Sequence, residues 1–271
     1  SSLAQAGKIE VVASFSILAD LVRQVGGDRV SVRSIVPANT DAHVYEPKPA
    51  DLVAVGRAKL IVINGLGFEA WADRIVRTAN FSGERLVASR GVRALSVRGQ
   101  TDPHAWQDVA NVKIYIANIR DALSKIDPAG ASSYASRAAS YDAQLDRLDA
   151  EIKASFARIP QANRKVVTSH DAFHYFGDAY DVVFLAPQGV STEGQASAKD
   201  VAALIRQIKE EKIRAVFVEN MTNGRIVQQI ANETGVKVGG TLYADALGGA
   251  ATSYVAMMRH NARSISGALA R

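Results

Sequence analysis

Eight short apolar runs rich in β-branched residues alternate along this chain with longer amphipathic segments. Most of the runs are continuously apolar, which is typical of parallel strands buried on both faces of a sheet. Four lie in each half of the chain, at 9–15, 30–36, 60–64, 85–88, 165–169, 182–186, 215–219 and 236–242. Alternating strands and helices fold into right-handed βαβ units. The pattern therefore predicts an α/β protein with a four-stranded, mainly parallel sheet flanked by helices in each half.

The amphipathic segments between these runs predict the helices. They span residues 17–25, 49–57, 69–78, 109–123, 198–211, 224–233 and 252–269. The chain has 271 residues, which exceeds the usual size of a domain with a single core. Two lobes are therefore the default expectation.

One long helical segment separates the two halves. Apolar residues recur at helical spacing from Tyr134 to Phe156. Pro128 suits the start of such a helix, and Pro160 ends it. A helix of about 30 residues is roughly 45 Å long, the length of a whole lobe. We therefore expect two lobes joined by one stiff helix, with the boundaries 1–126, 127–160 and 161–271.

The composition excludes several classes of protein. Cysteine is absent, which rules out disulfides, thiolate metal ligands and, within these residues, a lipidated cysteine. The net charge is +5, but the basic residues are scattered, so we expect no nucleic-acid partner. No stretch approaches the roughly 20 apolar residues of a membrane span, so we expect no direct membrane insertion. No signal segment begins at Ser1, and we expect that an exported protein has already lost its leader.

Three of the five histidines and one aspartate stand where a predicted strand gives way to a loop or a helix. They are His43 in TDAHVYEP, His104 in TDPHAW, His170 in VVTSHDAF and Asp245 in TLYADALGG. The carboxyl ends of parallel strands face the crevice in which α/β proteins bind ligands. Three imidazoles and a carboxylate are suitable donors for a first-row transition metal. Since two donors come from each half, the sequence predicts one ion held between two metal-binding lobes.

Other arrangements of the same residues are weaker. His170 and His174 have the spacing of an H-E-x-x-H metalloprotease, but His170 ends a predicted strand and Asp171 is too short to replace the glutamate base. Ser169-His170-Asp171 is not a hydrolase triad, because adjacent strand residues point to opposite faces. We expect His174 to pack or to face solvent, and His260 to lie on the surface of the last helix.

Several motifs together resemble the zinc- or manganese-binding receptors of bacterial metal-import ABC transporters, the cluster A-I (cluster 9) solute-binding proteins. The matching segments include DAHVYEPKPADL, LIVINGLGFEAW, DPHAW, VVTSHDAFHYF, STEGQASAKDVAALIRQIKEEKI, VFVEN and LYADALGG. The resemblance implies two α/β lobes bridged by one long helix, with the ion between them. The family's four ligand positions fall on His43, His104, His170 and Asp245. The resemblance also implies a non-enzymatic periplasmic receptor whose partner is a membrane ABC permease.

The chain departs from the family pattern in two places. The first ligand loop usually reads Pro-x-Gly-x-Asp-Pro-His, but here Asn39 replaces the glycine and Ala42 the proline. Asparagine tolerates a left-handed backbone better than other non-glycine residues, so we expect the loop to survive. The long histidine-rich loop of many zinc-specific members is absent before His104. Whatever such a loop does for metal capture, this chain does without it or leaves it to a partner, for example a metallochaperone.

The third ligand position bears on the choice of metal. Members that resemble manganese receptors commonly carry a carboxylate there, whereas this chain carries His170. Three imidazoles and one carboxylate favour zinc over manganese, so we expect one Zn²⁺ with Mn²⁺ as the alternative. Asp41, Asp102 and Glu219 are the candidates to orient the imidazoles. Ordinary histidine pKa values predict that metal binding fades below about pH 6.

These observations predict a monomeric receptor that binds zinc with high affinity and delivers it to the permease for import. Two other interpretations stay open. A zinc hydrolase would use the three histidines as ligands and Asp245 as its base. An adhesin of the same fold would bind host-matrix proteins without needing a metal.

Overall fold

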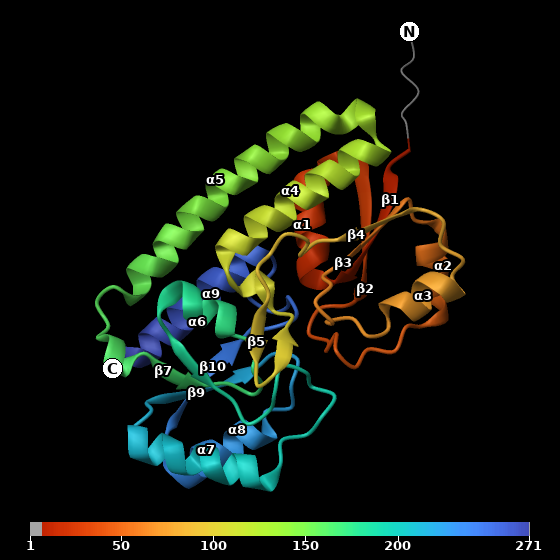
Figure 1. Cartoon of the computed structure of the whole chain (residues 1–271). Helices are drawn as coiled ribbons and strands as arrows, with labels where there is room; N and C mark the ends of the chain where they lie inside the picture. The colour runs from red at the N-terminus through yellow and green to blue at the C-terminus, as the bar shows by residue number, and fades with distance from the viewer. Residues whose placement is uncertain (1–6, 271) are drawn as a thin grey trace.

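Two four-stranded sheets lie at the centre of the protein, whose computed structural model describes residues 7–270 (Figure 1). Residues 1–6 and 271 lie outside the described residues. The sheets have the orders β2-β1-β3-β4 and β10-β9-β7-β8, and every pairing in both is parallel. Their strands are β1 (Ile9–Phe15), β2 (Val30–Val36), β3 (Leu60–Ile63), β4 (Glu84–Val87), β7 (Lys165–Val167), β8 (Val183–Leu185), β9 (Ala215–Glu219) and β10 (Lys237–Leu242). The predicted fold class is confirmed.

Helices flank both sheets. They are α1 (Ser16–Gly26), α2 (Pro49–Arg57), α3 (Ala72–Thr78), α4 (Val109–Ile126), α5 (Ala131–Phe156), α6 (His174–Tyr180), α7 (Ala198–Glu211), α8 (Arg225–Thr234) and α9 (Tyr254–Leu269). Helices α1 and α4 pack on the first sheet, and α7 and α8 pack on one face of the second. Within residues 7–270, no helix combines the length and the apolar character that crossing a membrane requires.

The long segment between the halves forms α5, a helix of 26 residues. A short 3-10 turn at Pro128–Gly130 precedes it, so the helix begins later than the predicted residue 127. Its buried side chains recur at helical spacing and pack against α1, α4 and α9. Figure 1 shows α5 (green) running beside both halves of the molecule. The helix therefore braces the two sheets, while the lobe limits at 126 and 160 stay a prediction.

One continuous hydrophobic core joins the two halves. It contains large side chains from both, among them Phe15, Tyr115, Phe156, Phe217 and Tyr254. The opposite face of the second sheet has a separate, smaller core with α7 and α8, to which Val167 and Val216 belong. Phe217 and Val216 lie in different cores because successive strand residues point to opposite faces. The halves are thus packed against each other and are not joined by a flexible linker alone.

Two elements between the halves were not predicted. The antiparallel hairpin of β5 (Leu95–Val97) and β6 (Gln100–Asp102) occupies a segment expected to be loop. Its turn residues Arg98 and Gly99 have φ angles of 50° and 77°, the left-handed pair of a tight hairpin turn. The second element is α6, which has seven residues and begins at His174. Strands of three residues and a helix of seven are too short for a hydrophobic period to be visible.

Candidate metal centre

The structure brings the four predicted ligands together beyond the carboxyl ends of the strands, between the two halves. His43 lies in the loop after β2, His104 two residues after β6, His170 after β7 and Asp245 after β10. His104, His170 and Asp245 are inaccessible to solvent, and His43 is 4% exposed. Four side chains that are far apart in the sequence therefore share one buried place. We call them the four-residue cluster.

The donor atoms of the four-residue cluster are spaced like the ligands of a single ion. Nε2 of His104 is 3.3 Å from Nε2 of His43 and 3.3 Å from Nε2 of His170. Oδ2 of Asp245 is 3.3 Å from Nε2 of His43 and 3.2 Å from Nε2 of His170. Its Oδ1 is 3.4 Å from Nε2 of His104. Tetrahedral zinc holds nitrogen and oxygen donors at about 2.0–2.2 Å, which places neighbouring donors about 3.3–3.6 Å apart. The residues fit one divalent transition metal.

The Asp245 carboxylate is a buried negative charge that a cation would compensate. It is fully buried, and neither of its oxygens has a hydrogen-bond donor among the described residues. The imidazole nitrogens lie at ion-pair distances but lack hydrogen-bond geometry to it. A buried carboxylate without donors is costly unless a positive charge compensates it. Either protonated imidazoles or a bound metal ion can supply that charge.

Two further carboxylates orient the imidazoles. Oδ1 of Asp102 lies 2.7 Å from Nδ1 of His104, and Oε2 of Glu219 lies 2.5 Å from Nδ1 of His170. Glu219 also accepts hydrogen bonds through Oε1 from the backbone N–H groups of Ser169 and His170, at 2.9 and 3.0 Å. A carboxylate at Nδ1 holds the proton there and leaves Nε2 free to bind a metal. Asp102 and Glu219 therefore take the orienting position predicted for them.

Asp41, the third candidate, does something different. Its Oδ1 accepts a hydrogen bond of 2.9 Å from the backbone N–H of His43, and Asp41 makes no side-chain bond to the His43 ring in the described structure. The expectation that Asp41 orients an imidazole is wrong. An aspartate two residues before another residue readily bonds that residue's backbone, because its side chain is short. Asp41 thus shapes the loop instead of the ring.

The loops that carry His43 and Asp245 are tied to each other and to the first half. Asn39 has φ 56°, the left-handed backbone that the sequence led us to expect, and its N–H donates to the Leu247 carbonyl at 2.9 Å. The Leu247 N–H donates to Oγ of Ser16 at 2.9 Å. The Ala244 carbonyl accepts from Nε1 of Trp106 at 2.9 Å. Asp245 comes from the second half of the sequence, yet its loop is fixed to the first.

Charge in the four-residue cluster shifts the protonation of its members. Burial disfavours the charged form of His104, but Asp245 and Asp102 outweigh burial and raise its pKa to about 9. Burial also opposes protonation of His170, yet Glu219 and Asp245 raise its pKa above the ordinary value. Burial raises the pKa of the Asp245 carboxyl, but His104 and His170 prevail and hold that pKa well below its usual range. Without metal, protons on imidazole therefore balance Asp245.

The remaining histidines lie outside the four-residue cluster. His174 is the first residue of α6, so His170 and His174 do not share a helix as a metalloprotease pair would. Nδ1 of His174 lies 3.5 Å from Oδ2 of Asp102. Nε2 of His260 lies 2.8 Å from the Thr241 carbonyl oxygen, on the partly exposed face of α9. Neither side chain reaches the common centre.

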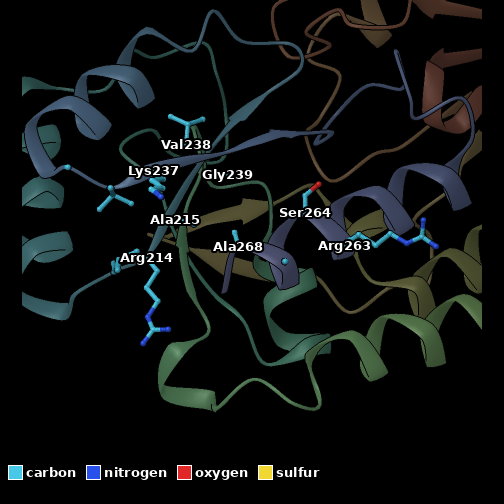
Figure 2. A pocket seen from close by; sticks show the side chains of 12 residues that line it. Arg214, Ala215, Lys237, Val238, Gly239, Arg263, Ser264 and Ala268 are labelled. Atoms are coloured by element: carbon cyan, nitrogen blue, oxygen red, sulfur yellow. The ribbon is translucent and has the colours of Figure 1, made fainter. Parts of the chain in front are cut away.

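Two cavities help to locate the site. One of about 680 Å³ reaches the four-residue cluster at His43, and its wall includes Phe68, Pro103 and Glu193. The other, of about 550 Å³, lies at the amino ends of β9 and β10, where it is lined by Arg214 and Arg263 but by no histidine or carboxylate (Figure 2). Figure 2 shows the two guanidinium groups pointing away from each other, so they do not converge on a ligand. Of these two cavities, only the one at His43 reaches side chains that can bind a metal ion.

Comparison with known proteins agrees with this geometry. A family model described as "Zinc-uptake complex component A periplasmic" matches residues 11–268. The manganese-binding lipoprotein MntA of Halalkalibacterium halodurans is 35% identical over 257 residues, which cover 93% of this chain and 86% of that protein. The manganese ABC transporter substrate-binding lipoprotein PsaA of Streptococcus pneumoniae is 32% identical over 280 residues, covering 98% and 90%. The structure of the periplasmic zinc-binding protein TroA from Treponema pallidum superposes with a TM-score of 0.94 at 31% identity, covering 98% of this chain and 100% of that one.

Proposed function

This chain belongs to the zinc-uptake component A family, the metal-binding receptors of ABC importers, and from that premise we propose how it holds and delivers its ion. The receptor binds one divalent transition metal through Nε2 of His43, His104 and His170 and through the carboxylate of Asp245. The observation that carries this assignment is the buried Asp245 carboxylate, which faces three imidazole nitrogens and has no hydrogen-bond donor within residues 7–270. The family consists of solute-binding proteins rather than enzymes, which argues against a zinc hydrolase.

We propose manganese as the first candidate for the delivered metal. Two of the relatives, MntA and PsaA, carry manganese in their names. Zinc binds almost any nitrogen–oxygen site more tightly than manganese does, so equilibrium affinity does not identify the cargo of an importer. The cargo is decided instead by which metal is available and by how readily the ion passes from the receptor to the permease. Both oxygens of Asp245 face the centre, and this leaves room for the higher coordination number that manganese takes.

Zinc is the second candidate, and a specific observation favours it. Three imidazoles outnumber the single carboxylate, and imidazole suits zinc better than it suits manganese. The donor spacings of 3.2–3.4 Å also correspond to short, tetrahedral bonds. TroA, named as a zinc-binding protein, has the same fold. The sequence-based expectation of zinc is therefore retained as the alternative to manganese.

The proposed partner is the membrane permease of an ABC importer, and the proposed location is outside the cytoplasmic membrane. Family membership supports both, because MntA, PsaA and TroA are named as lipoproteins or as a periplasmic protein. We propose that the receptor acts as a monomer, with a metallochaperone as a further candidate partner.

Competition between the two metals tests the proposed function. The metal-free protein is titrated with Mn²⁺ and with Zn²⁺ at buffered free concentrations, and the binding stoichiometry of each is measured. One ion per chain is expected for both, with zinc displacing manganese. Uptake of radioactive manganese and zinc into cells that depend on this receptor then identifies the cargo. A protein that binds neither ion would overturn the receptor assignment, and uptake of zinc alone would leave zinc as the function.

A further inference from the structure

The β5–β6 hairpin belongs to the first half by sequence but is held by the second half. The hydroxyl of Tyr175, on α6, accepts a hydrogen bond of 3.0 Å from the Leu95 N–H. The same hydroxyl donates a bond of 3.1 Å to the Asp102 carbonyl. Figure 1 shows the hairpin (yellow) between the two halves. Because β6 ends at Asp102, two residues before His104, the hairpin connects the second half directly to a proposed metal ligand.

Arg98, at the turn of this hairpin, reaches further into the second half. Its Nη2 donates a hydrogen bond of 3.0 Å to the Ala186 carbonyl. Its Nε lies 3.2 Å from Oδ2 of Asp171. Asp171 directly follows His170 and is only 4% exposed, whereas the Arg98 side chain is 55% exposed, so water screens the pair from the Arg98 side only. The guanidinium and the carboxylate form an ion pair without the geometry of a hydrogen bond, since Oδ2 of Asp171 has no hydrogen-bond donor among the described residues.

His174 extends the same contact toward His104. Its Nε2 lies 4.0 Å from Oδ1 of Asp171, and its Nδ1 lies 3.5 Å from Oδ2 of Asp102. Oδ1 of Asp102 holds the His104 ring at 2.7 Å. A row of titratable side chains therefore runs from Asp171, the neighbour of His170, to Asp102, the partner of His104. It crosses from one half of the molecule to the other.

The four proposed ligands are not divided evenly between the halves. His43 and His104 belong to the first half, and the Asp245 loop, which follows β10 and bonds Asn220 of the second half, is also bonded to the first half by Asn39 and Trp106. His170 is fastened to the second sheet by Glu219. Movement of His170 away from the other three ligands would open the site. Any such movement separates Asp171 from the hairpin as well.

We propose that Arg98 and Asp171 form an interlobe latch that slows release of the metal by holding His170 in place. The latch rests on the proposed function, since it acts on the same site. Arg98 contacts neither the ion nor its ligands, so it is a positioning residue. When the halves separate, the Asp171 carboxylate loses its guanidinium while still surrounded by protein, which makes the opening costly. Arg98 is not a glycine, yet it has a left-handed φ of 50°, so the backbone at this position is strained.

Metal release after addition of a chelator tests the latch. The full chain is loaded with Zn²⁺ and mixed with excess EDTA, and the release rate is followed for wild type, Arg98→Ala, Asp171→Asn and the double variant. Each single change should speed release up to about fivefold, the scale expected for loss of a partly exposed ion pair. The double variant should be no faster than the faster single variant, because both changes break the same contact. Arg93→Ala, which removes an exposed arginine of the same segment, is the matched control and should release zinc at the wild-type rate.

The outcomes separate the latch from the proposed function. Wild type that binds no zinc overturns both. Wild type that binds zinc but shares its release rate with Arg98→Ala overturns the latch alone. Additive effects in the double variant, or equal acceleration in Arg93→Ala, also overturn it, because they indicate general loosening. Asp171→Asn keeps the size of the side chain, so it remains informative if Arg98→Ala fails to fold.

Discussion

Oε2 of Glu219, at the end of β9, lies 2.5 Å from Nδ1 of His170, which precedes it by 49 residues. Both side chains are inaccessible to solvent. The contact fixes the ring with Nε2 toward Asp245, and it links the second sheet to the proposed ion. The hydrogen bond acts on the metal through the histidine, because a carboxylate at Nδ1 strengthens the other nitrogen as a donor.

Glu219→Gln should weaken zinc binding about 10–100-fold, the usual effect of removing such an outer carboxylate. Glutamine can accept the backbone bonds of Ser169 and His170, but it lacks the charge that polarises the ring. Competition with a fluorescent zinc chelator measures the change in Kd. Glu210→Gln, an exposed residue of α7, is the control. Equal affinities for the two variants would show that the charge of Glu219 has no influence on binding.

His104→Ala should reduce zinc affinity by several orders of magnitude while the metal-free protein stays folded. His104 lies at the centre of the cluster, within 3.4 Å of a donor atom on each of the other three residues. His174→Ala should change equilibrium affinity by less than about threefold, because His174 does not reach the centre. Isothermal titration of both variants provides the comparison. A loss of less than twofold for His104→Ala, about 0.4 kcal/mol, would remove it from the ligand set.

Metal affinity and the stability of the metal-free protein should depend on pH in opposite directions. The pKa of His104 is about 9 in the folded state, above its ordinary value of 6.5. The stability from its protonated form is therefore fully present below about pH 6.5 and is lost as the pH rises through about 9. Zinc displaces this proton, so affinity should rise over the same interval. Ordinary histidine pKa values predict that metal binding weakens only below about pH 6. The raised pKa of His104 shifts this weakening to higher pH.

Two measurements check this prediction. Thermal unfolding of the metal-free protein between pH 6.5 and 9.5 should show a falling Tm. Titration of zinc in buffers of different ionisation enthalpy at pH 7.5 should show release of protons on binding. A Tm that rises with pH, together with binding that releases no proton, would contradict the charge balance assigned to His104 and Asp245.

Residues 161–271 should not fold cooperatively when produced alone. The inner face of the second sheet and α9 share one core with the first half, and Phe217 and Tyr254 would lose their partners there. Exposure of such large apolar side chains costs about 1.5–3 kcal/mol of folding free energy each. A small domain is too marginally stable to remain folded after that loss. Near-ultraviolet circular dichroism and a urea titration measure the outcome. A sharp unfolding transition of this fragment would show that the halves are independent lobes.

The sequence predicts the inner strands of the sheets well because these strands are largely buried on both faces. Both β1 and β9 begin and end where the apolar runs do, and the hydrophobic pattern alone determines such strands. The convergence of His43 and Asp245 could be anticipated for the same reason, since both follow strands of parallel sheets. Their role as ligands is the proposal made above.

The contacts between the halves could not be predicted from the sequence. Asp171 and His174 stand next to an obvious motif, but their partners Arg98 and Asp102 lie in a hairpin too short to show a strand pattern. Asp41 was expected to orient a ring, and only the loop geometry shows that it bonds the backbone of His43. Side-chain contacts between distant segments depend on packing, which hydrophobic periodicity does not describe.

Anomalous diffraction from crystals of the metal-loaded protein is the most direct test of the central claim. Data collected on both sides of the metal absorption edge locate the ion without reference to its surroundings. We predict one strong anomalous peak about 2.0–2.2 Å from Nε2 of His43, His104 and His170 and from the Asp245 carboxylate. A peak elsewhere on the protein, or the absence of any peak among these four side chains at full metal loading, would contradict the account.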